Sequence, residues 1–326
     1  MHEPEMRERK MNRADIELRS AEWKALQTEC EEADSTNANH AVVEEKKMYM
    51  PDPETTEPTN TKTRVVVLGN GYVGSRIKSF FKDQPNIDVK VYDTNMSCTN
   101  FTSIKDLNAW EADYAFIAVP TPMSEDGSCD TSIVEDMIHR VDAGVYIIRS
   151  TVSPGTTDRL ARAYTAKNIV FSPEYFGETA NHPLNDMSER AFHILGGSSD
   201  ATALVCELYK EVYQDCIFYC VDATTAEVIK YAENAYLGTK VVFVEELKCI
   251  CDAIGVDFWK VREGWLLDPR INRSHTLPGK EGFAGFGGKC LPKDINAIAV
   301  ASKRAGYYPH FIQAVLDNND RLQRGD

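Results

Sequence analysis

The sequence has no uninterrupted run of eighteen or more apolar residues, so it predicts no membrane-spanning helix. It also lacks an excess of positive charge, because 36 Lys and Arg stand against 50 Asp and Glu, for a net charge of −14. Nucleic acid is therefore not an expected partner, since its phosphates require a basic surface. The first residues are charged rather than apolar, so no secretory signal is expected.

The nine cysteines lack any CxxC spacing, which argues against a zinc site, and no metal is predicted. Their odd number and scattered positions indicate reduced thiols rather than a disulfide framework. Reduced thiols in a chain with no expected signal or membrane span predict a cytoplasmic protein.

The length of 326 residues and a hydrophobic content of 43% predict one large domain and a smaller one. Residues 1–60 hold 15 Asp and Glu against 8 Lys and Arg, a balance of −7 that is half of the total charge. We predict an acidic tail or linker over 1–63, disordered or partly helical at about 6–30, with a partner-binding role as the alternative. The ordered part is predicted as one domain over 64–222 and a helical domain over 223–326.

The strongest local signal is a glycine-rich turn between a short apolar strand at 65–68 and a helical pattern. The turn reads Gly69-Asn70-Gly71-Tyr72-Val73-Gly74, and a second strand ends at Asp93, nineteen residues after Gly74. In a dinucleotide site, such glycines permit the tight turn, the approach of the pyrophosphate and the packing of the helix. Asp93 would bind the ribose hydroxyls and repel a 2′-phosphate, so NAD is the predicted cofactor.

Further apolar strands are predicted at 114–119, 145–148, 168–171, 191–197 and 216–219. Together with the glycine turn they predict an α/β fold, a Rossmann-like doubly wound parallel sheet followed by an all-helical central region. Ligands of such sheets lie beyond the carboxyl ends of the strands, where this chain has Thr121, Thr151, Glu174 and Glu178. We expect these four side chains to project into one crevice, although each alone is an ordinary turn residue.

Two polar segments of the helical region are candidates for catalysis. Lys230 and Asn234 are four residues apart and share one helix face, where they can bind an oxyanion; a solvated lysine is the simpler alternative. Cys290 follows Gly285-Phe286-Gly287-Gly288-Lys289 and stands at a predicted helix start, four residues before Asp294. A thiol at such a place is a candidate nucleophile, and a structural cysteine at a helix end is the alternative.

In sequence order, these segments resemble the UDP-glucose/GDP-mannose 6-dehydrogenase family from Val65 to about Leu322. The matching motifs are GNGYVG at 69–74, VPTP at 119–122, RSTVSPGTT at 149–157, SPEYFGE at 172–178, AEVIKYAENAYLGTK at 226–240, DPRI at 268–271 and GFGGKCLPKD at 285–294. The resemblance implies oxidation of the C6 alcohol of a nucleotide sugar to a carboxylate with two NAD in succession.

The resemblance also implies a role for each matched residue. Cys290 would form a thiohemiacetal and then a thioester, and Lys230 and Asn234 would stabilise the oxyanion. Asp294 would act as a base on water or on Lys230, and Glu174 with Thr151 nearby would order the hydrolytic water. Glu178 and Lys293 would help to hold the cofactor. The implied substrate contacts are Glu174, Tyr175, Phe176, Lys230, Asn234, Phe286, Gly287 and Arg270. Of these, Arg270 would reach the site of a partner subunit, in a homodimer formed through the central helices.

UDP-glucose is the substrate that the resemblance favours. The DPRI segment at 268–271 is typical of the UDP-glucose branch, and Gly288-Lys289-Cys290 with Pro292-Lys293-Asp294 differs from the members that act on N-acetylated sugars. Gly282-Phe283-Ala284 echoes the GDP-mannose branch, which is the alternative. Glu245 stands where the family usually has Asn.

The resemblance also implies a C-terminal nucleotide-sugar-binding domain that this sequence lacks. Three hypotheses follow. The chain is a dehydrogenase whose closing domain is missing because the chain is a fragment or because a separate chain supplies that domain; it is a minimal enzyme that acts without the domain; or it is an NAD-binding interaction protein without turnover.

Overall fold

The computed structural model describes residues 62–177, 184–279 and 284–325, all within one compact unit. No helix in these ranges is both long enough and apolar enough to cross a membrane. The predicted acidic tail over 1–63 lies almost entirely outside the described residues, and so does its predicted helix.

Within the described part of the chain, a single sheet has the strand order β2-β1-β3-β4-β5-β6-β7. Its strands are β1 (Thr63–Leu68), β2 (Ile87–Tyr92), β3 (Ala112–Ile117), β4 (Ala143–Ile148), β5 (Asn168–Phe171), β6 (Phe192–Gly196) and β7 (Ile217–Val221). The strands from β2 to β5 pair in parallel, and so do β6 and β7. This mostly parallel sheet confirms the Rossmann-like fold predicted from the glycine turn and the apolar runs.

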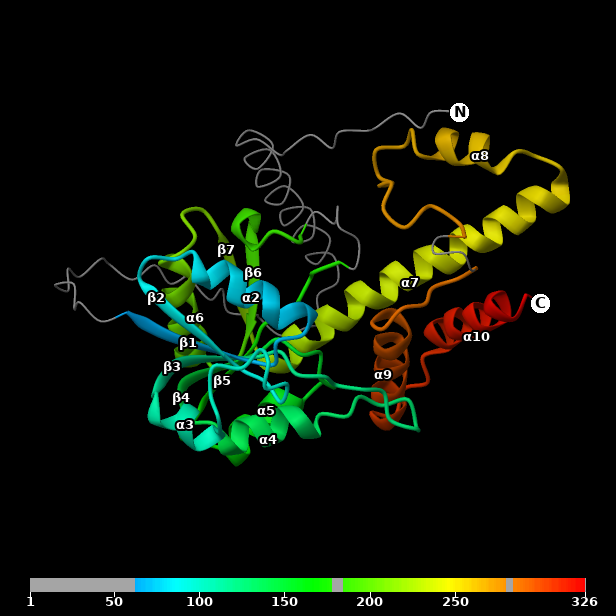
Figure 1. Ribbon diagram of the computed structural model, residues 1–326. Coiled ribbons are helices and arrows are strands. Elements are labelled where there is room, and N and C mark those ends of the chain that lie inside the picture. Colours follow the sequence, from blue (N-terminus) through cyan, green and yellow to red (C-terminus); the bar gives the residue numbers. More distant parts are fainter. Residues whose placement is uncertain (1–61, 178–183, 280–283, 326) are drawn as a thin grey trace, which may run out of the picture. The chain divides into compact units, whose positions relative to one another are not determined.

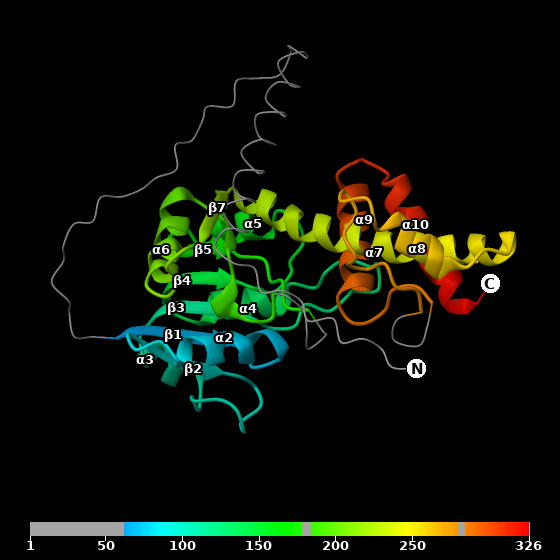
Figure 2. The same ribbon diagram turned by 90° about the horizontal axis from the view of Figure 1, so that it is seen from above.

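Helices cover both faces of the sheet (Figures 1 and 2). One face packs against α2 (Tyr72–Lys82) and α6 (Ser199–Lys210), and the other against α3 (Ile104–Ala109), α4 (Ser132–Arg140) and α5 (Thr156–Ala163). The strand β1 shows why the apolar run at 65–68 is continuous. Val66 and Leu68 enter one core cluster, Val65 and Val67 enter the other, and all four are fully buried.

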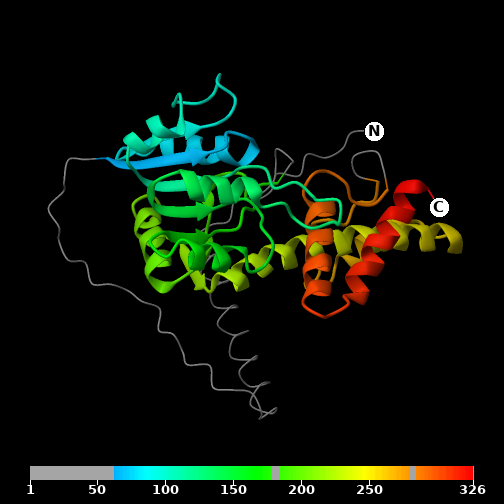
Figure 3. The same cartoon turned by 90° about the horizontal axis from the view of Figure 1, so that it is seen from below.

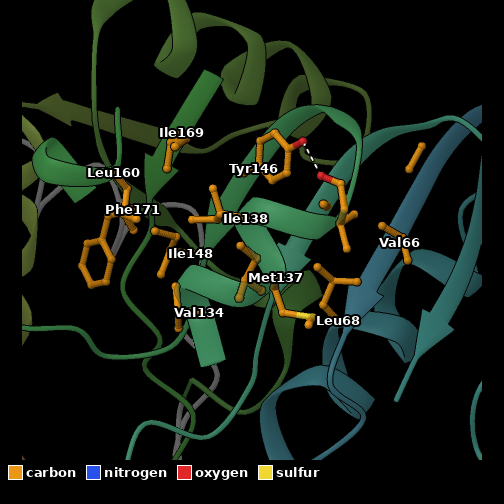
Figure 4. Close-up of a cluster of buried hydrophobic side chains, with 14 of the residues drawn as sticks. Val66, Leu68, Val134, Met137, Ile138, Tyr146, Ile148, Leu160, Ile169 and Phe171 are labelled. Carbon is orange, nitrogen blue, oxygen red and sulfur yellow. Dashed lines mark hydrogen bonds between the residues drawn. The ribbon is translucent and has the colours of Figure 1, made fainter. Parts of the chain in front are cut away.

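The core on the face of α3, α4 and α5 joins strands that are far apart in the sequence. Figure 4 shows it through Val66, Leu68, Val134, Met137, Ile138, Tyr146, Ile148, Leu160, Ile169 and Phe171. Tyr146 brings a hydroxyl into this apolar cluster, and the hydroxyl donates a hydrogen bond of 2.7 Å to the backbone oxygen of Val141. The buried phenol is thereby satisfied, as burial of a polar group requires.

The region after the sheet is helical, as predicted (Figures 1 and 3). It consists of α7 (Ala223–Ile254), α8 (Phe258–Trp265), α9 (Leu291–Arg304) and α10 (His310–Arg324), and both α9 and α10 pack against α7. Asp222 caps α7 by accepting a hydrogen bond of 2.9 Å from the backbone N–H of Thr225. The proposed domain boundary at 222/223 therefore falls at the junction between β7 and α7.

One detail of the sheet differs from the prediction of a parallel sheet. The pair of β5 and β6 is antiparallel, with Phe171 opposite Gly196. The connection between them carries, in its described residues, the short 3-10 helix η1 (Met187–Glu189) and no α-helix. Neighbouring parallel strands are usually joined by a crossover that contains an α-helix. The connection from β5 to β6 has none in its described residues, in keeping with the antiparallel direction of β6.

Candidate active site

The glycine turn is built as a dinucleotide site requires. Gly69 has φ +92°, and a Cβ there would lie 2.6 Å from the backbone oxygen of Ala118. A Cβ on Gly74 would lie 1.8 Å from the backbone oxygen of Gly69, so the close packing of α2 on β1 excludes any side chain. A Cβ on Gly71, the N-cap residue of α2, would meet no atom within 4 Å. The protein itself therefore does not require a glycine at position 71, whereas an approaching pyrophosphate would.

The surroundings of this turn fit NAD. Asp93 accepts hydrogen bonds from the backbone N–H of Asn70 at 2.6 Å and from that of Asn95 at 2.8 Å, so its carboxylate lies directly beside the turn. A carboxylate has further lone pairs that can accept ribose hydroxyls. The side-chain oxygen of Asn70 is buried and has no hydrogen-bond partner, and α2 has no side-chain cap at its N-terminus. Both features leave polar groups available to a bound phosphate or sugar.

Tyr72 and Val73 take different positions in the turn. Val73 packs against the core beneath α2. Tyr72 is 43% exposed, and its hydroxyl donates a hydrogen bond to the backbone oxygen of Gly177, which connects the glycine turn to the segment after β5. The guanidinium of Arg76 lies 3.7 Å from the centre of the Tyr72 ring and fixes that ring in place.

The predicted polar pair of α7 exists and extends to α9. Lys230 Nζ lies 3.2 Å from Asn234 Oδ1, and Asn234 Nδ2 donates a hydrogen bond of 2.6 Å to Asp294 Oδ2. The other carboxylate oxygen of Asp294 accepts from Lys293 Nζ. Lys230 also forms an ion pair of 2.9 Å with Glu233. Lys230, Asn234 and Asp294 are all buried, so the solvated-lysine alternative is wrong.

Cys290 lies at the N-terminus of α9, directly before this polar chain. It is the N-cap residue of α9, and its backbone oxygen accepts the N–H of Asp294 at 2.9 Å. Its side chain is exposed to solvent, so the alternative of a buried structural cysteine is wrong. A helix N-terminus stabilises a thiolate through its dipole and unsatisfied N–H groups. The thiol is therefore accessible to a substrate at a position that favours its reactive form.

The glycine-rich segment before Cys290 is held by residues that the sequence did not single out. Asn319 of α10 accepts the N–H of Phe286 at 2.7 Å and donates to its carbonyl at 3.1 Å, while Gln323 donates to the same carbonyl at 2.7 Å. Phe286 is 3% exposed and packs in the cluster between α7, α9 and α10. Gly285 has φ +85°, and a Cβ there would lie 2.5 Å from Asn319 Oδ1. Backbone and side chain of this segment are thus fixed from α10.

Glu245 of α7 holds the other end of the same segment. Its Oε1 accepts the N–H of Gly279 at 2.7 Å and that of Gly285 at 3.3 Å, and the side chain is buried. The departure from the family's usual Asn at position 245 therefore has a structural counterpart in this chain. Glutamate is one methylene longer than asparagine, and in this chain one of its oxygens reaches both N–H groups.

Glu174 is the centre of a buried charge cluster. Its two oxygens accept from the guanidinium groups of Arg149 and Arg190, and Oε1 also accepts the N–H groups of Tyr175 at 2.6 Å and Phe176 at 2.9 Å. Burial alone would raise the pKa of Glu174, but the positive charges of Arg149 and Arg190 lower it to about 2. The carboxylate is 8% exposed, so it holds the segment after β5 rather than lying in an open crevice.

The remaining crevice residues lie close to a cysteine that sequence reasoning missed. The thiol of Cys129 lies 3.2 Å from the backbone oxygen of Thr151 and 4.0 Å from that of Thr121. These two threonines, which follow β4 and β3, are therefore brought together beyond the carboxyl edge of the sheet. Burial raises the pKa of Cys129, so this thiol is stabilised in its neutral form.

Glu227 connects α7 to the segment that carries Thr151. This fully buried carboxylate accepts the N–H of Gly155 at 2.5 Å and that of Thr157 at 2.8 Å, at the start of α5. Burial raises the pKa of Glu227 to about 7 against the opposing effect of hydrogen bonds from Thr157 and Gly155. The N-terminal part of α7 is thereby fixed to the start of α5, about one helical turn before Lys230.

The structure also places the remaining predicted substrate residues. Tyr175 is buried, its hydroxyl has no hydrogen-bond partner, and its ring centre lies 5.0 Å from Lys230 Nζ. Phe176 lies beside Arg190, whose guanidinium is 4.5 Å from the ring centre. Gly287 is half-buried between Phe286 and the Cys290 turn. Glu178 lies outside the described residues, so its predicted place in the crevice stays a prediction.

Arg270 is not part of the Cys290 site in this chain. Its side chain is 87% exposed and forms an ion pair of 2.6 Å with Asp268. It lines a separate pocket of about 330 Å³ together with Tyr236, Thr239, Lys240, Phe243, Val244, Trp265, Ile271 and Asn272. An arginine turned to solvent next to an open pocket is suited to contact with a second molecule.

Both ordered parts of the chain match one protein family. Residues 88–217 match the NAD binding domain, and residues 224–321 the central domain, of the UDP-glucose/GDP-mannose dehydrogenase family. The first match begins after the glycine turn, so the assignment of the turn itself rests on the geometry described above. The two matches are adjacent and in the same order as the sheet and the helical region.

Individual relatives agree with this assignment. The UDP-glucose 6-dehydrogenase TuaD of Bacillus subtilis (strain 168) is 34% identical over 224 residues, covering 64% of this chain and 47% of TuaD. The structure of a UDP-glucose dehydrogenase from the hyperthermophilic archaeon Pyrobaculum islandicum aligns with a TM-score of 0.70 at 28% identity, covering 82% of this chain and 70% of that chain. The UDP-D-ManNAc dehydrogenase from Pyrococcus horikoshii aligns with a TM-score of 0.64 at 25% identity, covering 79% of this chain and 68% of that chain.

The match spans about half the length of TuaD. The two family matches cover the strands β3 to β6 in full and the helix α9, which begins at the exposed thiol, together with nearly all of α7, which carries Lys230 and Asn234. The chain therefore belongs to the UDP-glucose/GDP-mannose dehydrogenase family, of which it carries the NAD-binding and central domains.

Proposed function

We propose that this chain oxidises the C6 alcohol of UDP-glucose to a carboxylate with two NAD. One observation carries the proposal: an exposed thiol, Cys290, stands at a helix N-terminus directly before the buried chain of Lys230, Asn234 and Asp294. A nucleophile beside a cation and an amide donor is the arrangement needed to capture an aldehyde and to stabilise the oxyanion that forms.

The residues divide the work as follows. NAD, when bound, accepts the hydride that leaves C6 in each oxidation. The Cys290 thiolate attacks the C6 aldehyde to form a thiohemiacetal, and the second hydride loss leaves a thioester that water cleaves to the carboxylate. Lys230 and Asn234 stabilise the alkoxide of both tetrahedral states. Asp294, hydrogen-bonded to Asn234 and paired with Lys293, fixes the amide orientation and acts as the base.

The parts of the site around the sheet support cofactor binding and hydrolysis. Gly69, Gly71 and Gly74 would cradle the pyrophosphate, Asp93 the ribose, and Thr121, Lys293 and Glu178 would complete the cofactor contacts. Thr151 would help to order the hydrolytic water, whereas Glu174, which is buried between Arg149 and Arg190, would keep the segment after β5 in place rather than contact the water itself. Glu174 already holds the N–H groups of Tyr175 and Phe176, so it also shapes the substrate side of the site.

Assembly of the chain is part of the proposal. We infer a homodimer through the central helices, in which Arg270 contacts the nucleotide sugar of the partner subunit. Its support is the solvent-directed Arg270 next to an open pocket and the exposed apolar side chains Tyr236 (64%) and Phe243 (52%) on the same stretch of α7. A surface of this kind favours association.

The test is NADH formation by the purified 326-residue chain with UDP-glucose and, separately, with GDP-mannose. Two NADH per UDP-glucose are expected, and Cys290→Ser is expected to abolish or stall the second oxidation while NAD binding persists. Cys249→Ser is the matched control, because Cys249 is an exposed cysteine near the far end of α7 and should leave turnover unchanged.

Two outcomes would contradict this proposal. Turnover with GDP-mannose but not UDP-glucose would reject the substrate and keep the reaction. NAD binding without NADH from either sugar would favour the alternatives, namely an NAD-binding interaction protein or a half-enzyme completed by a separate chain. Adding a separately expressed closing domain from a relative would distinguish these two.

A further inference from the structure

A pair of cysteines lies at the edge of the sheet, away from the Cys290 site. Cys206 stands on α6 and Cys220 on β7, and their sulfur atoms are 3.8 Å apart. The register of the sheet explains the contact. Cys220 is opposite Leu195 of β6, which faces the core under α6, so Cys220 points to the same face as the helix that carries Cys206. The two thiols are thus directed at each other by the fold.

The pair is accessible and chemically asymmetric. Cys220 is exposed, because β7 is the last strand of the sheet within the described residues, and Cys206 is half-buried against the core. The thiol of Cys206, as a hydrogen-bond neighbour, lowers the pKa of Cys220 to about 7 against the effect of burial, with Thr202 and Lys210 assisting. One exposed thiolate and one adjacent thiol are the two roles that thiol–disulfide exchange requires.

We propose that Cys206 and Cys220 form a reversible dithiol–disulfide pair that reacts with a low-molecular-weight disulfide such as oxidised glutathione. The Cys220 thiolate attacks one sulfur of the oxidant, which forms a mixed disulfide and releases one thiolate. Cys206 then loses its proton and attacks the Cys220 sulfur, which forms the protein disulfide and releases the second thiolate. Overall, two cysteine thiols are oxidised, one oxidant disulfide is reduced, and two small thiols leave with the two protons.

The consequence follows from the position of β7. The strand ends at Val221, and the next residue, Asp222, caps α7, the helix that carries Lys230 and Asn234. A covalent bond between Cys206 and Cys220 would fix this edge strand to α6 and so anchor the start of α7. On oxidation the sulfur distance of 3.8 Å must shorten to the S–S bond length of about 2 Å.

The experiment exposes the reduced full chain to oxidised glutathione, alkylates the remaining thiols and maps disulfides by mass spectrometry. A linked Cys206–Cys220 peptide is expected, reversed by dithiothreitol. Cys206→Ser should trap Cys220 as a glutathione mixed disulfide. Oxidised wild type should melt on the order of 5 °C above the reduced form, and Cys206→Ser should show no such rise.

Cys216→Ser is the matched control, because Cys216 lies in the same region and precedes β7 without contributing to the 3.8 Å contact. The linked peptide should persist in that variant. A Cys216–Cys220 link in the wild type, or glutathione adducts on other cysteines without any Cys206–Cys220 link, would overturn the proposal. The readout is a peptide mass, so it does not depend on turnover of any sugar.

Discussion

Glu174 lies at the centre of a buried charge cluster with Arg149, which follows β4, and Arg190, which follows η1. Replacing Glu174 by Gln removes its negative charge but keeps the size of the side chain. In the wild type this carboxylate accepts from two buried guanidinium groups, those of Arg149 and Arg190, and from two backbone N–H groups. The variant leaves both arginines buried without a counter-charge, which is the costly way to disrupt a buried ion pair. The fold should therefore lose stability at neutral pH.

The size of the loss follows from the pKa. That of Glu174 falls from an ordinary value of 4.5 to about 2, with the arginine charges outweighing the effect of burial. One pKa unit corresponds to about 1.4 kcal/mol between the folded and unfolded states, so the charged form contributes about 3 kcal/mol at pH 7. Loss of one partner of a buried pair has a similar range of about 3–5 kcal/mol.

The same pKa fixes the pH dependence. Because the folded-state pKa of Glu174 is depressed, its contribution is fully present above about pH 4.5 and is lost as the pH falls towards about 2. His193 lies near the same cluster, and burial together with the charge of Arg149 lowers its pKa to about 3, which adds acid sensitivity below about pH 6.5. The difference between wild type and Glu174→Gln separates the Glu174 part from this background.

Urea unfolding followed by circular dichroism at pH 7, 5, 4 and 3 provides the measurement. Glu135→Gln is the matched control, because its partner Arg159 is 51% exposed and a surface pair contributes at most about 1 kcal/mol. We expect the Glu174→Gln deficit to be about 3 kcal/mol at pH 7 and to shrink below pH 4.5. A deficit no larger than that of Glu135→Gln, or one independent of pH, would refute the electrostatic account of this cluster.

Three further predictions concern the site. Gly71→Ala should raise the Kd for NAD at least about tenfold in calorimetric titration, because the new Cβ enters the open space before α2. Gly264→Ala is the control, because a Cβ on Gly264 also meets no atom but lies on α8, and its Kd should be unchanged. Asn319→Ala removes two hydrogen bonds to the backbone of Phe286, so it should destabilise the fold by about 1–3 kcal/mol. It should also lower kcat and leave the affinity for NAD unchanged, and turnover equal to wild type in an NADH assay would contradict this. Burial raises the pKa of Glu227 to about 7, so the contribution of this group to stability should fall by up to about 3 kcal/mol as the pH rises from 4.5 to 7. The difference in stability between wild type and Glu227→Gln should therefore change over that range, and a difference independent of pH would contradict this assignment.

The parts of the site that are encoded locally could be predicted from the sequence. The glycine turn and Asp93 are defined by a spacing that one βαβ unit dictates, and the structure places the carboxylate 2.6 Å from the N–H of Asn70. Lys230 and Asn234 are one helical turn apart, so their contact follows from α-helix geometry. Asp294 meets Asn234 because α7 and α9 pack together, which no local pattern could predict. The resemblance implied only that Asp294 acts as a base on water or on Lys230.

The residues that support the site could not be predicted in this way. Arg190 is sixteen residues from Glu174, and Asn319 is thirty-three residues from Phe286. Such separations carry no periodic signal, because the partners meet only after the sheet and the helices have packed. The antiparallel direction of β6 could not be predicted either. It depends on the connection from β5, whose residue composition does not differ from that of an ordinary loop.

The position of Cys290 thus depends on helices rather than on its own loop. Glu245 of α7 holds the N–H groups of Gly279 and Gly285, and Asn319 of α10 holds both backbone groups of Phe286. The glycines of the loop contribute little rigidity of their own, because glycine has the largest backbone freedom of any residue. Two helices therefore restrain the loop that precedes the thiol, and the helix that restrains it from one side, α7, also carries Lys230 and Asn234. The same helix, α7, therefore helps to position both the thiol and the oxyanion donors. Such a common support on a regular element is the condition for a preorganised site.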